Sequence, residues 1–237
     1  MQRNFKIALG VICVLAAAGV IWKVTQPDPS ANPIMSAGEA AIAVLPISSL
    51  NSLEPLPEGW THRSFWRIPA MELALVETAG VQAMRCKTNA SASILMRSTH
   101  ISLVDYPLLE WDWLVEKPIE SAIDEATEEG DDHPIRLLLQ VVDEAGERHV
   151  FEIIWSNKKY APGDYKYIHD FPHYVANGLA ENVGNWQHQQ LDLLAIYGEI
   201  SGQSDSPTLK SIGLFCDSDN TGASSIAYLS DVVLRQK

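Results

Sequence analysis

The sequence predicts an all-β domain, built as an antiparallel β-sandwich or jelly roll and preceded by an N-terminal transmembrane helix. Short runs rich in Val, Ile, Trp and Tyr recur beyond residue 60 and are separated by turn residues. Two of the gaps, Thr78-Ala79-Gly80 and Asp143–Gly146, have the composition of hairpin turns. An uncharged apolar run stands near the N-terminus. A composition of 46% hydrophobic and 20% charged residues excludes wholesale disorder.

The apolar run covers Ile7–Trp22, and Arg3 and Lys6 stand before it. As a helix it is about 24 Å long, which is short for a bilayer core of about 30 Å. We interpret residues 1–24 as a signal anchor or a signal peptide. We favour the uncleaved anchor, because apolar residues continue past the possible cleavage site Ala16-Ala17-Ala18. The basic residues keep the N-terminus in the cytoplasm and place the rest of the chain across the membrane.

Residues 25–57 are predicted to form a proline-rich tether, because the spacing of their prolines forbids a long helix and suits an extended chain. The prolines are Pro27, Pro29, Pro33, Pro46, Pro55 and Pro57. The apolar patch Ala40–Leu45 interrupts this segment, and we expect it to dock on the domain as a stray strand. The β-sandwich domain itself is assigned to residues 58–237.

Eight strands are predicted within the domain. They are Leu73–Val76, Val81–Cys86, Ser91–Met96, Leu108–Val115, Ile135–Val142, Arg148–Ser156, Ser211–Cys216 and Ser224–Leu234. Two segments have helical potential, Ile119–Glu129 with one apolar side and Leu191–Tyr197. An excess of strands over helices is typical of two packed antiparallel sheets.

Charge and cysteine content exclude several classes of protein. Thirty acidic and 17 basic residues give a net charge of -13, which disfavours a nucleic-acid partner because binding to phosphates needs clustered Lys and Arg. Three cysteines cannot form a four-thiolate zinc site or a disulfide scaffold. Cys86 and Cys216 fall in the exported domain, where oxidation is permitted, but the sequence favours two buried free thiols over a disulfide.

Several segments resemble, in order, the bacterial family catalogued as domain of unknown function 3047 (DUF3047). They are Gly59–Phe65 (GWTHRSF), Ser91–Arg97 (SASILMR), Tyr106–Lys117 (YPLLEWDWLVEK), Gly130–Val141 (GDDHPIRLLLQV), Ile153–Lys158 (IIWSNK) and Asp217–Val232 (DSDNTGASSIAYLSDV). The family usually has a basic residue before the GDD segment, where this chain has Glu128 and Glu129. The resemblance implies an exported bacterial β-sandwich similar to galactose-binding-like and other carbohydrate-binding modules. It implies no established activity.

Glu110-Trp111-Asp112-Trp113 alternates along a predicted strand, so the indoles share one face and the acids share the other. The structural interpretation, which we favour, places both tryptophans in the core. A sugar-stacking platform is the functional alternative. A further alternative is a glycan hydrolase that uses Glu110 and Asp112, since carboxylates two residues apart can reach the spacing of a retaining glycosidase.

A second polar group surrounds Arg136, which follows Pro134 at the start of a predicted strand. We predict that Asp132, Arg136, Trp155 and Asn157 form a ligand-binding surface. The Arg136 fork would bind hydroxyl or carboxylate groups, and Asp132 would orient it. The structural alternatives are an ion pair at the rim and a Trp155 side chain in the core.

The segment Asp217–Gly222 offers closely spaced oxygen ligands and ends on a glycine. We predict a possible structural Ca²⁺ at Asp217, Asp219 and Asn220, and a strand-to-strand turn is the equal alternative. Asp231 is expected to join either arrangement. A zinc site at His169 and His173 is rejected, because Pro172 interrupts the helix that their spacing needs.

Two further segments receive structural interpretations. The aromatic residues between Tyr160 and Tyr174 are expected to form a long loop that packs over a sheet edge. The seven acids between Glu120 and Asp132 are expected to form a solvated face.

Three functions remain open. The leading hypothesis is an exported, non-catalytic binding domain, tethered to the bacterial inner membrane with its domain in the periplasm or outside the cell. Its ligand would be a glycan or a similar polyhydroxylated molecule. The alternatives are a glycan hydrolase and a structural envelope protein that binds other proteins.

Overall fold

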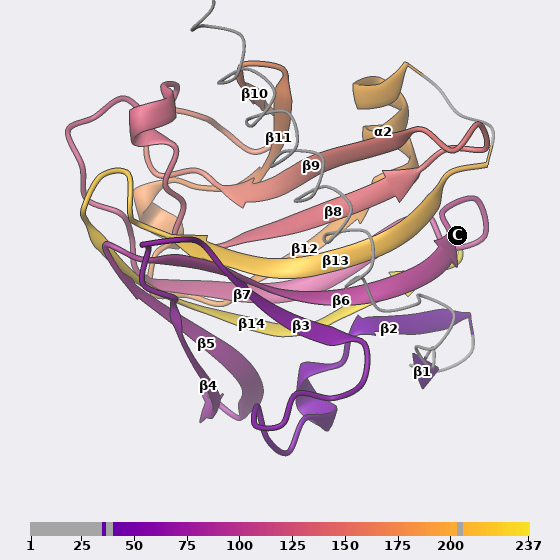
Figure 1. Cartoon of the computed structure of the whole chain (residues 1–237), viewed down its shortest axis with the longest axis horizontal. Helices are drawn as coiled ribbons and strands as arrows, with labels where there is room; N and C mark the ends of the chain where they lie inside the picture. The colour runs from indigo at the N-terminus through magenta and orange to yellow at the C-terminus, as the bar shows by residue number, and fades with distance from the viewer. Residues whose placement is uncertain (1–34, 37–39, 203–205) are drawn as a thin grey trace, which may run out of the picture.

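The computed structural model describes residues 35–36, 40–202 and 206–237, which form two seven-stranded β-sheets packed face to face (Figure 1). The predicted all-β sandwich is confirmed. The predicted leader, residues 1–24, lies outside the described residues. Among the residues that are described, no helix has the length and apolar character needed to cross a membrane.

The first sheet is organised around β14, which pairs with three other strands. Its members are β1 (Met35–Ser36), β2 (Ala41–Leu45), β4 (Glu72–Thr78), β5 (Val81–Asn89), β7 (Leu108–Lys117), β12 (Gln187–Asp192) and β14 (Ser224–Arg235). One edge of β14 pairs with β5 through its first half and with β2 through its last four residues, while the other edge pairs with β7. β4 extends the sheet beyond β5, and β12 extends it beyond β7.

The second sheet has the order β10-β11-β9-β8-β13-β6-β3. Its members are β3 (Trp60–Ser64), β6 (Ala92–Ser102), β8 (Arg136–Val142), β9 (Arg148–Trp155), β10 (Tyr165–Ile168), β11 (Phe171–Asn177) and β13 (Thr208–Asp217). Every pairing is antiparallel except β11 with β9, which is parallel. The hairpin predicted at Asp143–Gly146 joins β8 to β9, and the one at Thr78-Ala79-Gly80 joins β4 to β5.

The core lies between the two sheets and is built by the two-residue alternation of the strands. On β8, Leu137, Leu139 and Val141 are buried in this core. The rings of Trp111 and Trp113 meet edge to face with centroids 5.2 Å apart, and both residues belong to the buried core. The predicted core position of these two tryptophans is therefore confirmed.

The ordered domain begins earlier than the predicted boundary at residue 58. Ala41–Leu45 is buried and pairs with β14 as strand β2, as expected for this apolar patch. The buried Arg97 side chain of β6 donates hydrogen bonds to the carbonyl oxygens of Ala43 and Val44, at 2.8 and 2.9 Å. The second half of the predicted tether is thus part of the sandwich.

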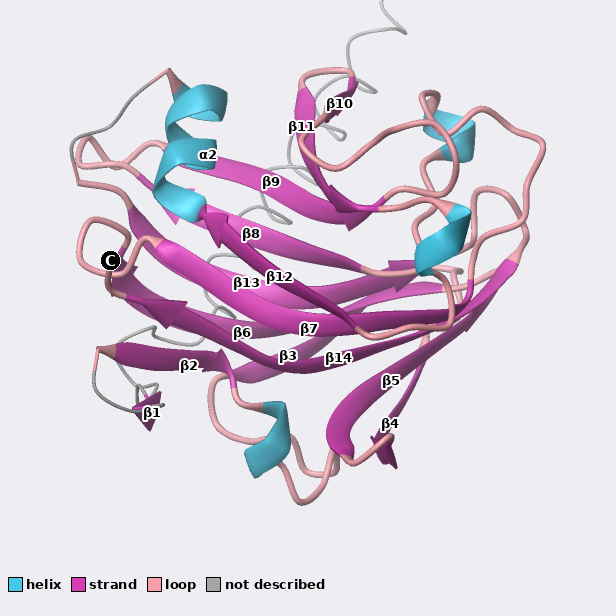
Figure 2. Cartoon of the chain, turned by 180° about the vertical axis from the view of Figure 1, so that it is seen from behind, coloured by secondary structure: helices cyan, strands magenta, loops and turns pink. Residues whose placement is uncertain are grey.

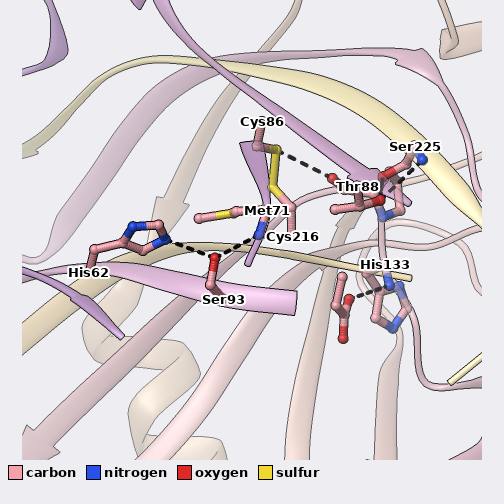
Figure 3. Close-up of a disulfide and its surroundings, with 10 residues drawn as sticks. His62, Met71, Cys86, Thr88, Ser93, His133, Cys216 and Ser225 are labelled. Atoms are coloured by element: carbon pink, nitrogen blue, oxygen red, sulfur yellow. Dashed lines mark hydrogen bonds between the residues drawn. A yellow bond between two sulfur atoms is a disulfide. The ribbon is translucent and has the colours of Figure 1, made fainter. Parts of the chain in front are cut away.

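Cys86 of β5 and Cys216 of β13 form a disulfide between the two sheets, with Cα atoms 6.5 Å apart (Figure 3). The prediction of two buried free thiols is wrong. Both side chains point into the core, and the packing of the sheets brings together residues that are 130 positions apart in the sequence. Sequence spacing carries no information about that distance.

In the described part of the chain, helix is confined to short segments at the periphery of the sandwich (Figure 2). These are α2 (Leu193–Ser201) and the 3-10 turns η2 (Ile47–Ser49), η3 (Glu128–Gly130) and η4 (Ala180–Asn182). The helix α2 corresponds to the one predicted at Leu191–Tyr197, and the Asp192 carboxylate caps it by accepting a bond from the Ala195 N–H.

The helix predicted at Ile119–Glu129 is not formed; the segment consists of bends and turns that end in η3. Asp124 accepts a hydrogen bond from the Ala126 N–H at 3.0 Å, a local turn that competes with helix. Glu125 is buried and accepts bonds from Ser156 Oγ and the Asn157 N–H, both at 2.7 Å. Tertiary contacts to this carboxylate therefore fix the segment as a loop.

The aromatic segment predicted as a long loop is instead a short loop followed by the β10–β11 hairpin at the edge of the second sheet. The hairpin turns at His169, which has a φ of 52° and an exposed side chain. His173 lies on β11 and is buried. The two histidines therefore occupy different environments and do not converge.

Candidate functional site

The candidate site lies on the outer face of the second sheet, which turns away from the sandwich core. Because Leu137 and Ile153 point into the core, their neighbours Arg136 and Glu152 point outward. The same alternation turns Asp217 outward, since Cys216 points inward. Phe215 is the register partner of Arg136 on the adjacent strand. The apolar strand sequences thus place a few charged and aromatic side chains together on this face.

These side chains line a cavity of about 310 Å³. Its apolar wall includes Phe65, Phe171 and Phe215. Its polar wall consists of Asp131, Arg136, Glu152, Asp217, Asp219 and Asn220. Aromatic rings beside a small number of convergent polar groups are the usual lining of a small-molecule site.

Arg136 is the centre of the polar wall and is 2% exposed. Its guanidinium donates to Glu152 at 2.7 Å, and it is also bonded to the Asp217 carboxylate. The Asp131 carbonyl oxygen accepts a third bond at 3.0 Å. Although burial opposes its charge, the surrounding carboxylates raise the pKa of Arg136 well above its usual value. Arg136 is therefore a permanently charged anchor that holds acids from three separate segments.

The guanidinium of Arg136 also stacks on an aromatic wall of the cavity. Its Cζ atom lies 4.2 Å from the centroid of the Phe215 ring. The Arg136 Nε–H is buried and has no hydrogen-bond acceptor among the described residues.

Arg136, Asp131, Glu152 and Asp217 form a group that we call the Arg136 cluster. Lys166 of β10, His133 and His173 contact this cluster. Lys166 is paired with Asp131 and hydrogen bonds to His133 Nε2 at 2.9 Å. His173 Nε2 lies 3.2 Å from Glu152 and 3.5 Å from Asp131. Burial and the Lys166 charge lower the pKa of His133 to about 4, so this ring is neutral at pH 7. Although burial opposes it, the two nearby histidines and the Arg136 charge hold the pKa of Asp131 well below its usual range.

The structure divides the four residues predicted to form a ligand surface. Arg136 lines the cavity, but Trp155 is 1% exposed and lies in the core, with its ring centroid 5.7 Å from that of Trp113. Asn157 lines a separate cavity of about 270 Å³, and its amide donates to the Asp132 carbonyl oxygen. Trp155 and Asn157 therefore do not share a surface with Arg136.

Asp132 does not orient Arg136 as the sequence suggested; Asp217 and Glu152 do so. The Asp132 carboxylate instead accepts bonds from the backbone N–H groups of Asn220 and Thr221, at 3.2 and 2.7 Å. It therefore caps the turn between β13 and β14. This contact joins the GDD segment to the DSDNTG segment in space.

The calcium prediction named Asp217, Asp219 and Asn220. In the structure, Asp217 and Asp219 meet Asp132, with one oxygen of each carboxylate within 4.8 Å of the others. The Asn220 amide instead donates to the Glu128 carbonyl oxygen at 2.6 Å. Because Asp217 and Asp132 already have cationic or N–H partners, the geometry suits a capped turn, and calcium binding stays a prediction.

Asp231 does not join this group. Its carboxylate accepts bonds from the Ser48 N–H at 2.7 Å and from Ser48 Oγ at 2.6 Å, on the first sheet. The expectation that Asp231 takes part in the calcium site or its turn is therefore wrong, and the residue holds the chain after β2 against β14.

Glu110 and Asp112 share the outer face of the first sheet, as their alternation predicted. They line a separate cavity of about 310 Å³ together with Asp231 and Arg235. Arg235 is paired with Glu110, and His188 Nδ1 lies 3.2 Å from Asp112. The whole thickness of the sandwich separates these carboxylates from Arg136.

Sequence reasoning missed Glu152, Lys166, His173 and the three phenylalanines of the cavity. Glu152 carried a signal, because it is a single acid within the apolar stretch from Phe151 to Trp155. Lys166 stands between two tyrosines on a short strand, and nothing local distinguishes it from a surface lysine. Its partner Asp131 is 35 positions away, so only the sheet order brings them together.

The fold and the cavity define a class: a β-sandwich with a ligand-sized, mixed aromatic and charged cavity on the outer face of one sheet. The chain belongs to the family described as "Protein of unknown function (DUF3047)", whose sequence model matches residues 58–233. The resemblance drawn from the sequence motifs is thus confirmed. No curated protein matches the chain.

Three solved structures illustrate the similarity of fold. The xyloglucanase domain of NopAA, a type three effector from Sinorhizobium fredii solved with cellobiose, is 8% identical with a TM-score of 0.41; the match covers 76% of this chain and 95% of that one. The glycoside hydrolase domain of Endo-D from Streptococcus pneumoniae is 11% identical with a TM-score of 0.38, and the match covers 75% of this chain and 22% of that one. A variant of the family 29 carbohydrate-binding module CBM29-2 is 15% identical with a TM-score of 0.28, covering 76% and 83%. At these TM-scores the likeness carries no information on what this chain binds.

Proposed function

We propose that this chain is an exported, membrane-tethered and non-catalytic binding domain for a glycan or a similar polyhydroxylated ligand. The observation that carries the proposal is the cavity on the second sheet. It combines three phenylalanine rings with carboxylate, amide and guanidinium groups in about 310 Å³. Apolar C–H faces of a sugar pack on aromatic rings, while its hydroxyl groups need fixed donors and acceptors.

The polar groups of the cavity are held in place before any ligand arrives. Glu152 and Asp217 are both bonded to Arg136, and Asp131 is bonded to Lys166. Side chains that are already ordered lose little conformational entropy on binding, which favours affinity.

The hydrolase alternative has less support than the binding function. Glu110 is paired with Arg235, which occupies one of its two carboxylate oxygens. Asp112 has the exposed His188 as its partner. Turnover of a glycan panel that is lost in Glu110→Gln would favour this alternative over the binding domain.

Two features support export and tethering. The run Ile7–Trp22 follows basic residues, a pattern typical of an inner-membrane anchor with its N-terminus in the cytoplasm. The Cys86–Cys216 disulfide is suited to an oxidising compartment such as the periplasm. Membrane fractionation, together with protease access from the periplasmic side, tests this location. A full-length product in the cytosolic fraction would contradict it.

A glycan array probed with the full chain in mild detergent tests the binding function. We expect selective retention of a glycan, confirmed by calorimetry and weakened about tenfold in Phe171→Ala, because an aromatic wall is lost. Tyr228→Ala is the matched control, since Tyr228 belongs to the outer face of the other sheet. Loss of affinity in both variants alike, or an array without signal, would contradict the proposal. An empty array with a specific protein partner would favour the structural envelope protein instead.

A further inference from the structure

A β-turn with an exposed indole stands at the edge of the cavity. The Ile68 N–H donates to the Phe65 carbonyl oxygen at 3.3 Å, which places Trp66 and Arg67 at the tip of the turn. Phe65 and Ile68, the two ends of the turn, both line the cavity. The tip is therefore continuous with the cavity wall but projects beyond it.

Trp66 has no burial role in the described part of the chain. Trp66 is 82% exposed, more than any other large apolar residue of the described segments. Trp111 and Trp155, by contrast, are 1% exposed. An indole this exposed contributes little to the packing of the fold, but beside the cavity it offers a flat apolar surface on which a sugar ring can stack.

Arg67 fixes the orientation of this indole. Its guanidinium carbon lies 4.1 Å from the centroid of the Trp66 ring, so one face of the ring is covered by a planar cation. The exposure of Trp66 leaves the opposite face open to solvent. Arg67 has a φ of 64°, a left-handed conformation that favours glycine at this position of a type II turn. The turn therefore keeps a disfavoured residue that holds the ring in place.

We propose that Trp66 is a second sugar-binding position that stacks on a further unit of a linear, neutral oligosaccharide whose first unit occupies the cavity. The inference rests on the proposed glycan-binding function and specifies its ligand as an oligosaccharide rather than a single sugar. Phe65 lines the cavity and is the chain neighbour of Trp66, so a linear chain that leaves the cavity past Phe65 passes the turn that carries Trp66. The acidic residues of the cavity disfavour an anionic sugar.

Titration of the full chain with cello-oligosaccharides and chito-oligosaccharides of one to six units tests this proposal. We expect the affinity to rise at least about tenfold from one unit to the longer oligomers. Trp66→Ala is expected to remove about fivefold of the affinity for long oligomers, the worth of one aromatic contact, and to leave the single-unit affinity unchanged. Because Trp66 is exposed, this variant is expected to melt at the wild-type temperature.

Arg67→Gly separates folding from binding. Glycine relieves the positive φ, so the melting temperature is expected to stay level or rise, while loss of the stacked guanidinium weakens binding of the long oligomers alone. Tryptophan fluorescence adds a direct readout: the ligand-induced change is expected to vanish in Trp66→Phe and to persist in Trp186→Phe, the matched control beside the first sheet.

The outcomes distinguish this inference from the proposed function. Affinity that does not depend on oligomer length, or long oligomers that bind Trp66→Ala as tightly as wild type, overturns the role of Trp66 and leaves the cavity function intact. If neither series binds, the role in binding neutral linear glycans is overturned. If no glycan on the full array binds, the proposed function itself is overturned.

Discussion

Cys86 of β5 is bonded to Cys216 of β13, so a covalent link joins the two sheets one residue before Asp217, a member of the buried Arg136 cluster. Asp217, together with Asp219, begins the turn that Asp132 caps. The disulfide therefore anchors the strand end that supplies two acids to the cavity.

Removal of the disulfide is expected to destabilise the fold. A link that closes a loop of 130 residues stabilises a protein by about 2–5 kcal/mol, mainly by restricting the unfolded chain. Chemical denaturation of the Cys86→Ala/Cys216→Ala variant measures the loss. Dithiothreitol should lower the stability of the wild type toward that of the variant and leave the variant unchanged. Equal stability of both proteins under oxidising conditions would refute the link.

A chain that begins at residue 58, the start of the family match, is expected to be much less stable than one that begins at residue 40. It lacks β2, whose carbonyl groups accept the hydrogen bonds of the buried Arg97 side chain. Loss of partners for a buried charge costs about 3–5 kcal/mol. Replacement by Arg97→Met in the shorter chain should recover part of the loss, and melting curves of the three proteins test this. Equal melting temperatures for the two lengths would contradict the role of β2.

The free energy of unfolding should fall at acid pH because of Asp131 and Glu152. Burial opposes their charge, but Arg136 and His173 lower both pKa values below the ordinary 3.8 and 4.5, and His133 also lowers that of Asp131. Folded-state pKa values below those of the unfolded chain stabilise the fold above about pH 5, and this stability is lost as the pH falls. Asp217 has the opposite effect on stability. Burial raises its pKa to about 7, so its protonation stabilises the fold as the pH falls from about 7 to 4.

The Asp131→Asn variant tests the contribution of Asp131 to this loss of stability at acid pH. The variant should lose about 2–4 kcal/mol at pH 7, because Lys166 keeps its burial without its anionic partner. The difference from wild type should begin to shrink between pH 5 and pH 3, because protonation of Asp131 in the unfolded chain starts to remove the wild-type advantage. Urea denaturation at several pH values measures both effects. A constant difference across this range would contradict the pKa shift of Asp131.

Gly213 and Gly198 are expected to respond oppositely to alanine. A Cβ on Gly213 would lie 3.0 Å from the Ile94 side chain and 3.1 Å from the Leu95 carbonyl oxygen, so Gly213→Ala should cost about 1–3 kcal/mol. A Cβ on Gly198 of α2 meets nothing within 4 Å, so Gly198→Ala should add about 0.5–1 kcal/mol. Thermal melts of the two variants measure both effects. If both variants were stabilised, or both destabilised, the packing described at one of the two glycines would be contradicted.

Calcium binding is tested by melting the EDTA-treated protein with and without millimolar Ca²⁺. An ion that neutralises Asp132, Asp217 and Asp219 would raise the melting temperature, and Asp219→Asn would remove the rise. An unchanged melting temperature would leave Asp132 as a turn cap alone.

The strands of the sandwich were largely predictable because their signal is local. Two-residue alternation placed Trp111 and Trp113 in the core, and turn residues marked the two hairpins. The helix at Ile119–Glu129 failed because Glu125 bonds to a distant segment, a contact that no local pattern reveals. The parallel pairing of β11 with β9 was missed for the same reason.

Within the candidate site, Arg136 could be predicted from the sequence, but the residues around it could not. Arg136 could be found because a charged residue opens an otherwise apolar strand. Its partners Glu152 and Asp217 are 16 and 81 positions away, and only the order of β9, β8 and β13 brings them into contact. Trp155 was grouped with Asn157 because residues two apart on a strand share a face, but the alternation of β9 turns Trp155 into the core, which was the structural alternative.

Strand β2 also sets how far the domain can stand from a membrane anchor. With Met35–Ser36 paired to β2 and Ala41–Leu45 paired to β14, only residues 25–34 remain as a linker between the proposed anchor and the sandwich. A fully stretched segment of this length reaches about 35 Å, about a third of the reach of the whole stretch from 25 to 57. A polysaccharide captured by the cavity would therefore be drawn to within a few nanometres of the lipid surface.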